Sequence, residues 1–118
     1  MDKVLVLVGH GADEAALLQY RKLLDAVRKG GKRAFLVMLH GEPGAQQVAK
    51  ELEKQGITSA KLIPLLLAPG HHMEKNIVSE DSEIHREFSA RGIDLEVSKK
   101  TLLEYDSIID AITKVLDE

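Results

Sequence analysis

Short apolar runs alternate with longer amphipathic segments along the chain, and this alternation is typical of parallel α/β folds. The runs that we predict to be strands cover residues 4–8, 34–39, 62–67 and 93–97. The first three runs are almost continuously apolar, as expected for strands that are covered on both faces. The last run alternates Ile93, Leu95 and Val97 with polar residues, which predicts an edge strand.

Four further segments repeat apolar residues at helical spacing, and we predict a helix in each. These segments cover residues 16–27, 45–52, 79–88 and 105–116. Pro43 is expected in the first turn of the second helix, and residues 79–81 are expected to cap the third. The most regular apolar face belongs to the fourth: Tyr105, Ile108, Ile109, Ile112, Val115 and Leu116.

Together these elements predict one (βα)4 domain over residues 1–118, in which helices cover both faces of a four-stranded parallel sheet through right-handed crossovers. Pro64 does not fit this pattern easily, because it lies inside the third run and lacks the N–H that a central strand donates. Either the strand has an edge or a bulge at Pro64, or it begins later than residue 62.

Composition excludes several classes of function. The chain has 118 residues and no cysteine, which excludes disulfides, iron–sulfur clusters, thiolate zinc sites and a cysteine nucleophile. Its 16 basic and 19 acidic residues give a net charge of −3, which argues against a general nucleic-acid binder. Neither a membrane span nor a signal peptide is recognisable, so we expect a soluble, cytoplasmic protein.

Histidine is the main chemical resource of this sequence, and its distribution is uneven. His10 follows the first predicted strand, His40 ends the second, and His71 and His72 follow the third, whereas His85 lies in the third helix. In open α/β sheets, ligands bind in the crevice beyond the carboxyl ends of the strands. Four of the five histidines are therefore predicted at the edge of the sheet where such folds carry out their chemistry.

Each histidine also has a purely structural interpretation. His10 is flanked by glycines, so it is either a loop residue bonded to the backbone or an imidazole that a sharp turn directs over the sheet edge. His40 is either a cap for the following helix or part of the site. Because neighbouring side chains point apart, only one of His71 and His72 is expected to face the crevice. We expect His85 to be a solvated helix residue.

Imidazole is a good ligand for borderline divalent ions such as Co²⁺, Ni²⁺, Fe²⁺ and Zn²⁺. Without cysteine, a closed structural zinc site is not expected. Two or three histidines around an open position would suit a metal that is held transiently, and they would equally suit proton acceptors.

Several segments resemble one enzyme family, the class II tetrapyrrole chelatases, which insert cobalt, nickel or iron into sirohydrochlorin. The resemblance rests on VLVGHG at the start, HGEP after the second strand and IPLLLAPGHHMEKNI around the third, and SEDSEIHREF and TLLEYDSIIDAI extend it to the C-terminal half of the anaerobic cobalt chelatases. The length is similar to that of the small chelatases that consist of one such half and act as homodimers. The resemblance thus implies a flavodoxin-like chelatase half, a tetrapyrrole substrate, a role in cobalamin biosynthesis and a divalent metal as substrate, with no tightly bound cofactor.

The resemblance also implies roles for particular residues. His10 and His72 match the two histidines that bind the metal and assist proton removal from the pyrroles. His40 is implied as a third metal ligand, at a position where the similar cobalt enzymes often have glutamate. Glu42 and Asn76 are implied to contact the tetrapyrrole, and Asn76 stands where the family commonly has aspartate.

Two other classes of function remain open from the sequence. One is a homodimer that binds a metal, haem or another tetrapyrrole without turnover. The other is a phosphate- or nucleotide-binding module of flavodoxin-like fold. Against the second, VGHGADE lacks both the glycine pattern of a dinucleotide loop and the lysine of a P-loop.

Overall fold

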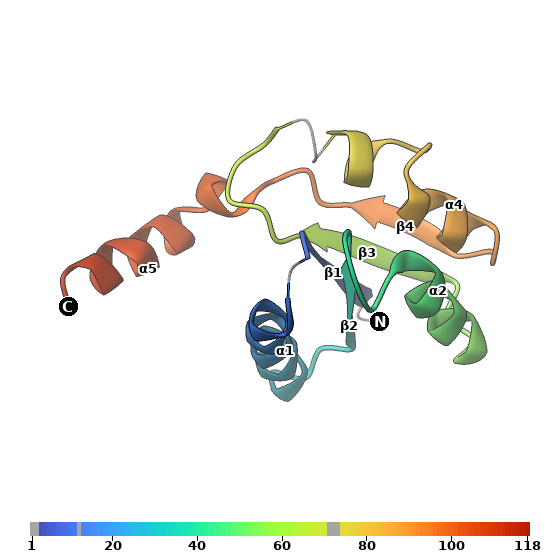
Figure 1. The fold of residues 1–118 in the computed structure, drawn as a ribbon, viewed down its shortest axis with the longest axis horizontal. Coiled ribbons are helices and arrows are strands. Elements are labelled where there is room, and N and C mark those ends of the chain that lie inside the picture. Colours follow the sequence, from blue (N-terminus) through green and yellow to red (C-terminus); the bar gives the residue numbers. More distant parts are fainter. Residues whose placement is uncertain (1–2, 12, 71–73) are drawn as a thin grey trace.

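The computed structural model describes residues 3–11, 13–70 and 74–118. Within these residues, parallel strands form one sheet with the order β2-β1-β3-β4 (Figure 1). The strands are β1 (Val4–Gly9), β2 (Ala34–Met38), β3 (Ser59–Pro64) and β4 (Asp94–Val97). The predicted four-stranded parallel sheet is confirmed, and β4 lies at an edge as its alternating pattern indicated.

Helices lie on both faces of this sheet, as predicted. They are α1 (Glu14–Lys29), α2 (Ala45–Lys54), α4 (Glu83–Ser89) and α5 (Asp106–Leu116), with a π-helix η1 (Glu74–Val78) and a 3₁₀ helix η2 (Leu102–Glu104). The chain passes from β1 outward to β2 and then returns across β1 to β3 and β4. Because the direction reverses after β2, α1 packs on one face of the sheet, and α2 and α4 pack together on the other.

The two faces differ in how completely they are covered. Between the sheet and the α2–α4 layer lies the larger apolar cluster, in which Leu52, Leu62 and Phe88 have no exposed surface. Between the sheet and α1 lies a smaller cluster that includes Leu7, Leu24 and several side chains that are only partly buried. Most of the hydrophobic stabilisation, which scales with the apolar area removed from water, therefore comes from the α2–α4 side.

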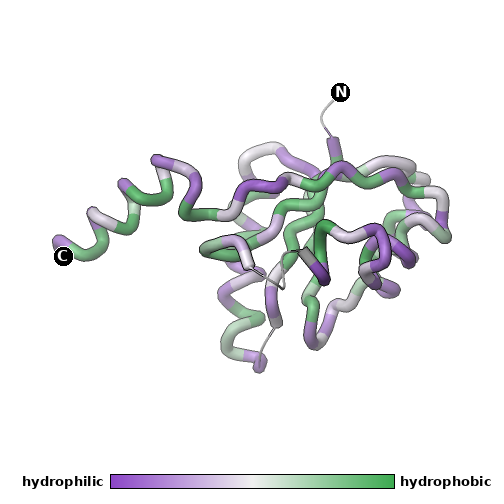
Figure 2. The backbone as a smooth tube through the Cα atoms, turned by 90° about the horizontal axis from the view of Figure 1, so that it is seen from above, coloured by the Kyte–Doolittle hydropathy of each residue, from purple (hydrophilic) through white to green (hydrophobic). Residues whose placement is uncertain are grey.

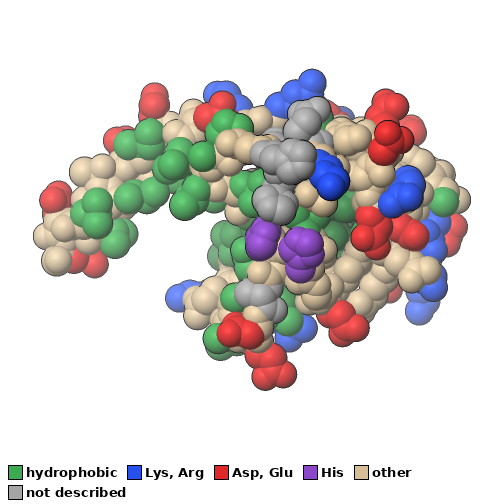
Figure 3. All heavy atoms as spheres, turned by 45° about the horizontal axis from the view of Figure 1, so that its top comes forward, with side chains coloured by type: hydrophobic (Ala, Val, Ile, Leu, Met, Phe, Trp, Pro, Cys, Tyr) green, Lys and Arg blue, Asp and Glu red, His purple; other side chains and the backbone are tan. Residues whose placement is uncertain are grey.

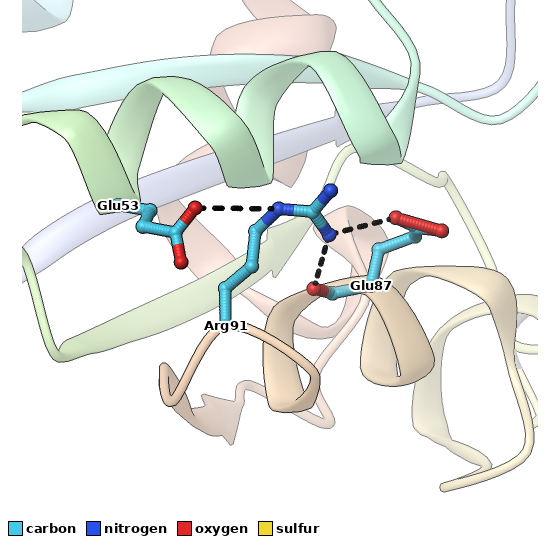
Figure 4. A network of polar contacts seen from close by, with 3 residues as sticks. All are labelled: Glu53, Glu87 and Arg91. Atoms are coloured by element: carbon cyan, nitrogen blue, oxygen red, sulfur yellow. Dashed lines mark hydrogen bonds and ion pairs between the residues drawn. The ribbon is translucent and has the colours of Figure 1, made fainter.

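A polar network ties α4 to α2 at the outer surface of this layer (Figure 4). Arg91 Nη1 donates to the carbonyl oxygen of Glu87 at 3.0 Å and to Glu87 Oε2 at 2.9 Å. Its Nε lies 3.8 Å from Glu53 Oε1 on α2. Since only 15% of the Arg91 side chain is exposed, it links the ends of two helices that the core already holds together.

Helix α5 differs from the other helices because it projects away from the sheet (Figures 1 and 2). None of its residues is buried. The radius of gyration is 14.4 Å, which exceeds the value of about 13.5 Å expected for a compact chain of this length. None of the helices in the described part of the chain combines the length and apolar character that spanning a bilayer requires.

Strand β3 corrects the prediction around Pro64. It covers residues 59–64 and not 62–67, so Pro64 ends the strand. The N–H of Leu65 donates to Val8 on β1, so the nitrogen of Pro64 faces the other side, toward β4. The last β3–β4 pair joins Leu62 to Val97, so no partner in the ladder requires an N–H from residue 64.

The expected place of Pro43 in the second helix and the expected cap of the third helix were also wrong. Pro43 lies before α2, whose N-cap is Gly44. The Pro43 carbonyl accepts a hydrogen bond from the N–H of Met38. Helix α4 begins at residue 83 because the Ser82 hydroxyl, and not a side chain of residues 79–81, accepts from the N–H of His85. Residues 79–82 form a tight turn, and the Ser82 N–H donates to the Ser79 carbonyl.

Candidate functional site

His10 lies at the carboxyl edge of the sheet, directly after β1. The next residue, Gly11, has φ of +112°, and a Cβ placed there would lie 1.9 Å from the His40 carbonyl oxygen. Only glycine fits this position, because any side chain would collide with the backbone of the neighbouring loop. The glycine thus lets the two loops that carry His10 and His40 approach each other closely.

The backbones of these loops are also hydrogen-bonded to each other beyond the strands. The Leu39 N–H donates to the Gly9 carbonyl at 2.9 Å, and the His40 N–H donates to the His10 carbonyl at 3.0 Å. The pairing of β1 with β2 therefore continues past the end of both strands. As a result, the separation of residues 10 and 40 is set by backbone hydrogen bonds.

The two imidazoles form a pair on the surface. Their ring centroids are 5.1 Å apart and their planes are inclined by 71°, so the edge of one ring faces the other ring. Both residues are exposed, and Figure 3 shows histidine side chains at the margin of a concave, largely hydrophobic surface. Imidazole nitrogens that bind one ion lie about 2 Å from it, so a shared ion requires the two rings to be close neighbours, as they are here.

A hollow of about 220 Å³ lies next to this pair, between the loop after β2 and the start of α4. Its walls include Gly41, Gly44, the half-buried Asn76 of η1, and Glu83. Asn76 thus lies near the loop that carries His40. Glu42 is exposed in the same loop and is not among the residues that line the hollow.

The structure does not group the other predicted site residues with the pair of His10 and His40. His71 and His72 lie outside the described residues. Among residues 3–11, 13–70 and 74–118, no three His, Asp or Glu side chains are grouped closely enough to hold a metal ion. The part of the site that can be seen is therefore the pair of His10 and His40 with the adjacent hollow.

His85 was predicted wrongly as a solvated residue. It is half-buried, and its Nε2 lies 2.9 Å from the carbonyl oxygen of Ile77 in η1. This contact joins α4 to the π-helix that carries Asn76. The sequence signal that could have revealed it is Ser82 three residues earlier, because a cap at Ser82 fixes His85 in the first turn of α4, on the side of the preceding segment.

Among the described residues, two carboxylates have a lowered pKa, and both lie outside the histidine pair. The N–H and the hydroxyl of Thr101 both donate to Glu104 Oε2, at 2.6 and 2.9 Å, and lower the pKa of Glu104. A hydrogen bond from Lys3 lowers the pKa of Glu96 on the edge strand β4. Glu104 forms a capping box around η2, immediately before α5, so its charge stabilises the segment from which that helix leaves the domain.

Fold and histidine pair together describe an α/β protein with a candidate site at the carboxyl edge of a parallel sheet. The sequence profile described as cobalt chelatase (CbiK) matches residues 1–118. The chain belongs to the cobalt chelatase (CbiK) family, which confirms the family expected from the sequence motifs.

Individual relatives agree with this assignment. The chain is 24% identical over 110 residues to "Sirohydrochlorin cobaltochelatase CbiKC" of Nitratidesulfovibrio vulgaris strain Hildenborough. That alignment covers 92% of this chain and 39% of the relative, so the chain spans about two fifths of the relative's length. A crystal structure described as a putative cobalamin (vitamin B12) biosynthesis CbiX protein from Marinobacter aquaeolei superposes with a TM-score of 0.82 at 21% identity, covering 97% of this chain and 93% of that one. The second similarity confirms the fold.

Proposed function

We propose that this protein inserts Co²⁺ into sirohydrochlorin, with Ni²⁺ and Fe²⁺ as further candidate metals. The observation that carries the proposal is the pair of His10 and His40, whose rings lie 5.1 Å apart at the carboxyl edge of the sheet. Membership of the cobalt chelatase family and the name of the relative from N. vulgaris support the same reaction. The metal is a substrate, and we propose no tightly bound cofactor.

In the proposed reaction, the incoming ion replaces the two protons on the inner nitrogens of the macrocycle. His10 and His40 bind the ion, and His72, whose role rests on the resemblance alone, acts with His10 as ligand and proton acceptor. Holding the metal and the macrocycle in one cleft converts a bimolecular encounter into a positioned one. We propose that Asn76 and Glu42 contact the tetrapyrrole, because both lie on segments next to the histidine pair.

We further propose that the protein acts as a homodimer. A tetrapyrrole is broader than the rim of one four-stranded sheet, whereas two rims that face each other form a cleft around it. A two-fold axis would bring both sets of histidines to the same guest. The cytoplasmic location and the organisation of residues 1–118 as one chelatase-like domain stay predictions from the sequence.

The test is the rate of Co²⁺ insertion into sirohydrochlorin, followed by the change in absorbance of the macrocycle. We expect His10→Ala to lower kcat by about 10²-fold or more, because it removes both a ligand and a proton acceptor. The variant His40→Ala should slow insertion less, because in the proposed reaction His10 and His72 accept the protons. Gln46→Ala is the matched control, since Gln46 is exposed on α2 and lies outside the site.

The same assay separates a chelatase from a carrier. A chelatase accelerates the absorbance change catalytically, with many turnovers per chain. A carrier gives a shift that saturates at one equivalent and does not speed up insertion. If the parent protein behaves as a carrier, or if His10→Ala inserts Co²⁺ as fast as the parent, the proposed activity is wrong.

A further inference from the structure

Strand β2 forms the edge of the sheet opposite β4, and a groove runs along its open side. Helix α1 lies on one side of this strand and α2 on the other (Figure 1). Between the two helices lies a hollow of about 240 Å³, which we call the β2 groove, and its walls include Arg21, Arg28, Phe35, Leu36 and Val48. Sites for whole small ligands usually measure about 300–1,000 Å³, so the β2 groove has the size for the end of a chain.

The backbone of β2 presents hydrogen-bonding groups to this groove. The Arg33 carbonyl and the Leu39 N–H both bond to β1. Because alternate residues of a parallel strand bond to the same neighbour, the N–H and C=O groups of residues 34, 36 and 38 point the other way, toward the open side.

The two ends of this open side are already bonded within the chain. Arg28 Nε donates to the Ala34 carbonyl at 2.9 Å, and the Met38 N–H donates to the Pro43 carbonyl at 2.7 Å. Leu36 lies between them, and no described residue outside the ladder bonds to its N–H or C=O. Since Leu36 is only 4% exposed, water has little access to these groups. Such a pair of groups favours a ligand that supplies one acceptor and one donor.

Arg28 is held in place for binding an anion. The backbone bond fixes its Nε, and its guanidinium carbon lies 5.9 Å from the centre of the Phe35 ring, so both Nη groups are left for a ligand. Arg21 lies two turns away on the same side of α1, about 10 Å along the helix axis. In the part of the chain that the structure describes, no carboxylate forms an ion pair with either arginine. Together they outweigh the one carboxylate of the groove, Glu51 on α2.

We propose that the β2 groove binds the carboxyl terminus of another polypeptide. The penultimate residue of that chain pairs with Leu36 in antiparallel direction, so that its N–H donates to the Leu36 carbonyl and its carbonyl accepts from the Leu36 N–H. This direction carries the chain end toward Ala34, where the terminal carboxylate meets Arg28. Because Arg28 already occupies the Ala34 carbonyl, the added strand ends there, and a free end binds in preference to an internal segment.

The groove also indicates which side chains such a terminus carries. A residue opposite Leu36 places its side chain on the same side of the sheet, next to Leu24 of the smaller core cluster. The last residue points to the other side, toward Phe35 and Val48. Both positions therefore favour apolar residues, and Arg21 is placed to bind an acidic side chain further upstream.

The test is a titration of ¹⁵N-labelled protein with the peptide acetyl-Ser-Ser-Val-Leu, which has a free carboxylate. We expect the amide signal of Leu36 to shift in a saturable way. The same peptide with an amidated C-terminus should bind about tenfold or more weakly, because it lacks the charge that meets Arg28. A peptide with N-methylated valine lacks the donor for the Leu36 carbonyl and should also bind more weakly.

Protein variants test the same contact from the other side. Arg28→Gln should weaken binding of the free-carboxylate peptide by about tenfold or more and should change binding of the amidated peptide much less. Lys29→Gln is the matched control, since it removes the same charge from the exposed neighbouring residue, which does not line the groove. Its affinity should equal that of the parent. If Arg28→Gln fails to fold, the comparison of the three peptides on the parent still decides the outcome.

Several results would overturn the inference. One is that no peptide shifts the Leu36 signal in a saturable way, and another is that the amidated peptide binds as tightly as the free one. Equal losses for Lys29→Gln and Arg28→Gln would show attraction by net charge alone. If sodium acetate shifts the Leu36 signal as strongly as the peptide at the same concentration, the groove is an anion site and not a peptide site. The titration needs neither Co²⁺ nor sirohydrochlorin, so its result is independent of the proposed activity.

Discussion

The two faces of the sheet differ in how completely helices bury their apolar side chains. On the face covered by α2 and α4, two helices pack against each other and against the strands, and side chains such as Phe88 and Leu62 have no exposed surface. On the other face α1 stands alone, and α5, which would follow β4 on that side, projects away from the sheet. The comparison teaches that the α2–α4 face is fully enclosed, whereas the α1 face keeps partly exposed apolar side chains.

Substitutions in the two cores should reveal this difference most strongly. We expect Phe88→Ala to lower the free energy of unfolding by about 3–5 kcal/mol, because it leaves a cavity in a fully enclosed cluster. Leu24→Ala, in the smaller cluster, should cost about 2 kcal/mol, near the lower end for such changes, because its surroundings can close more easily.

Urea unfolding at one fixed protein concentration measures both variants, since association changes the apparent stability. Ile108→Ala on α5 is the control. It should change the free energy of unfolding by less than about 0.5 kcal/mol, because no residue of α5 is buried within its own chain. If Phe88→Ala and Leu24→Ala lower the free energy of unfolding equally, the two faces do not differ in how tightly they are packed.

A smaller effect is expected where the covered face meets the site. His85→Ala removes the contact with the Ile77 carbonyl and should cost about 1 kcal/mol in stability. Because this contact holds η1, which carries Asn76, we expect KM for the tetrapyrrole to rise several-fold while kcat changes little. His85→Gln keeps a donor at the same end of the side chain and should restore part of the affinity.

Steady-state kinetics at varied sirohydrochlorin concentration distinguish the two roles of His85. If His85 only stabilises the fold, all variants that remain folded will have the KM of the parent. Arg86→Ala, an exposed neighbour on α4, serves as the control.

The smallest expected effect concerns η2, the short turn that precedes α5. Glu104→Ala removes the capping box before α5 and should lower the melting temperature slightly at pH 7. Because the pKa of Glu104 is lowered in the folded protein, its stabilising contribution is present above the pKa of the unfolded chain and is lost as the pH falls through the folded value.

The parent and Glu104→Ala should therefore differ in melting temperature at pH 7, and the difference should shrink as the pH falls below the ordinary glutamate pKa of about 4.3. Glu80→Ala, which removes an exposed carboxylate elsewhere, controls for net charge. A difference that persists unchanged to pH 3 would show that the charge of Glu104 is not the cause.

Periodicity was sufficient to predict the sheet, its helices and the edge position of β4, because apolar spacing follows directly from which face is buried. It failed around Pro64, since apolar residues continue beyond the strand: Leu65 and Leu66 still pack against the core clusters after the ladder has ended. The period identified the apolar face of α5 but could not tell whether that face is buried within the chain.

The site was predictable in part for a similar reason. The ends of parallel strands meet at one edge, so His10 and His40 could be placed near each other from the order of the elements alone. The contact of His85 with Ile77 could not be predicted in this way, because it depends on a π-helix of five residues that has no spacing pattern in the sequence. The roles of His72, Glu42 and Asn76 stay predictions.

The continued pairing of the loops after β1 and β2 has a consequence for redesign. The main chain sets the spacing of positions 10 and 40, and Gly11 keeps the loops in contact whatever side chains those positions carry. Donor atoms can therefore be exchanged at both positions, a carboxylate for one imidazole or a thiolate for the other, without rebuilding the scaffold. Such a pair of interchangeable positions is a natural starting point for selecting enzymes with a preference for softer or harder ions.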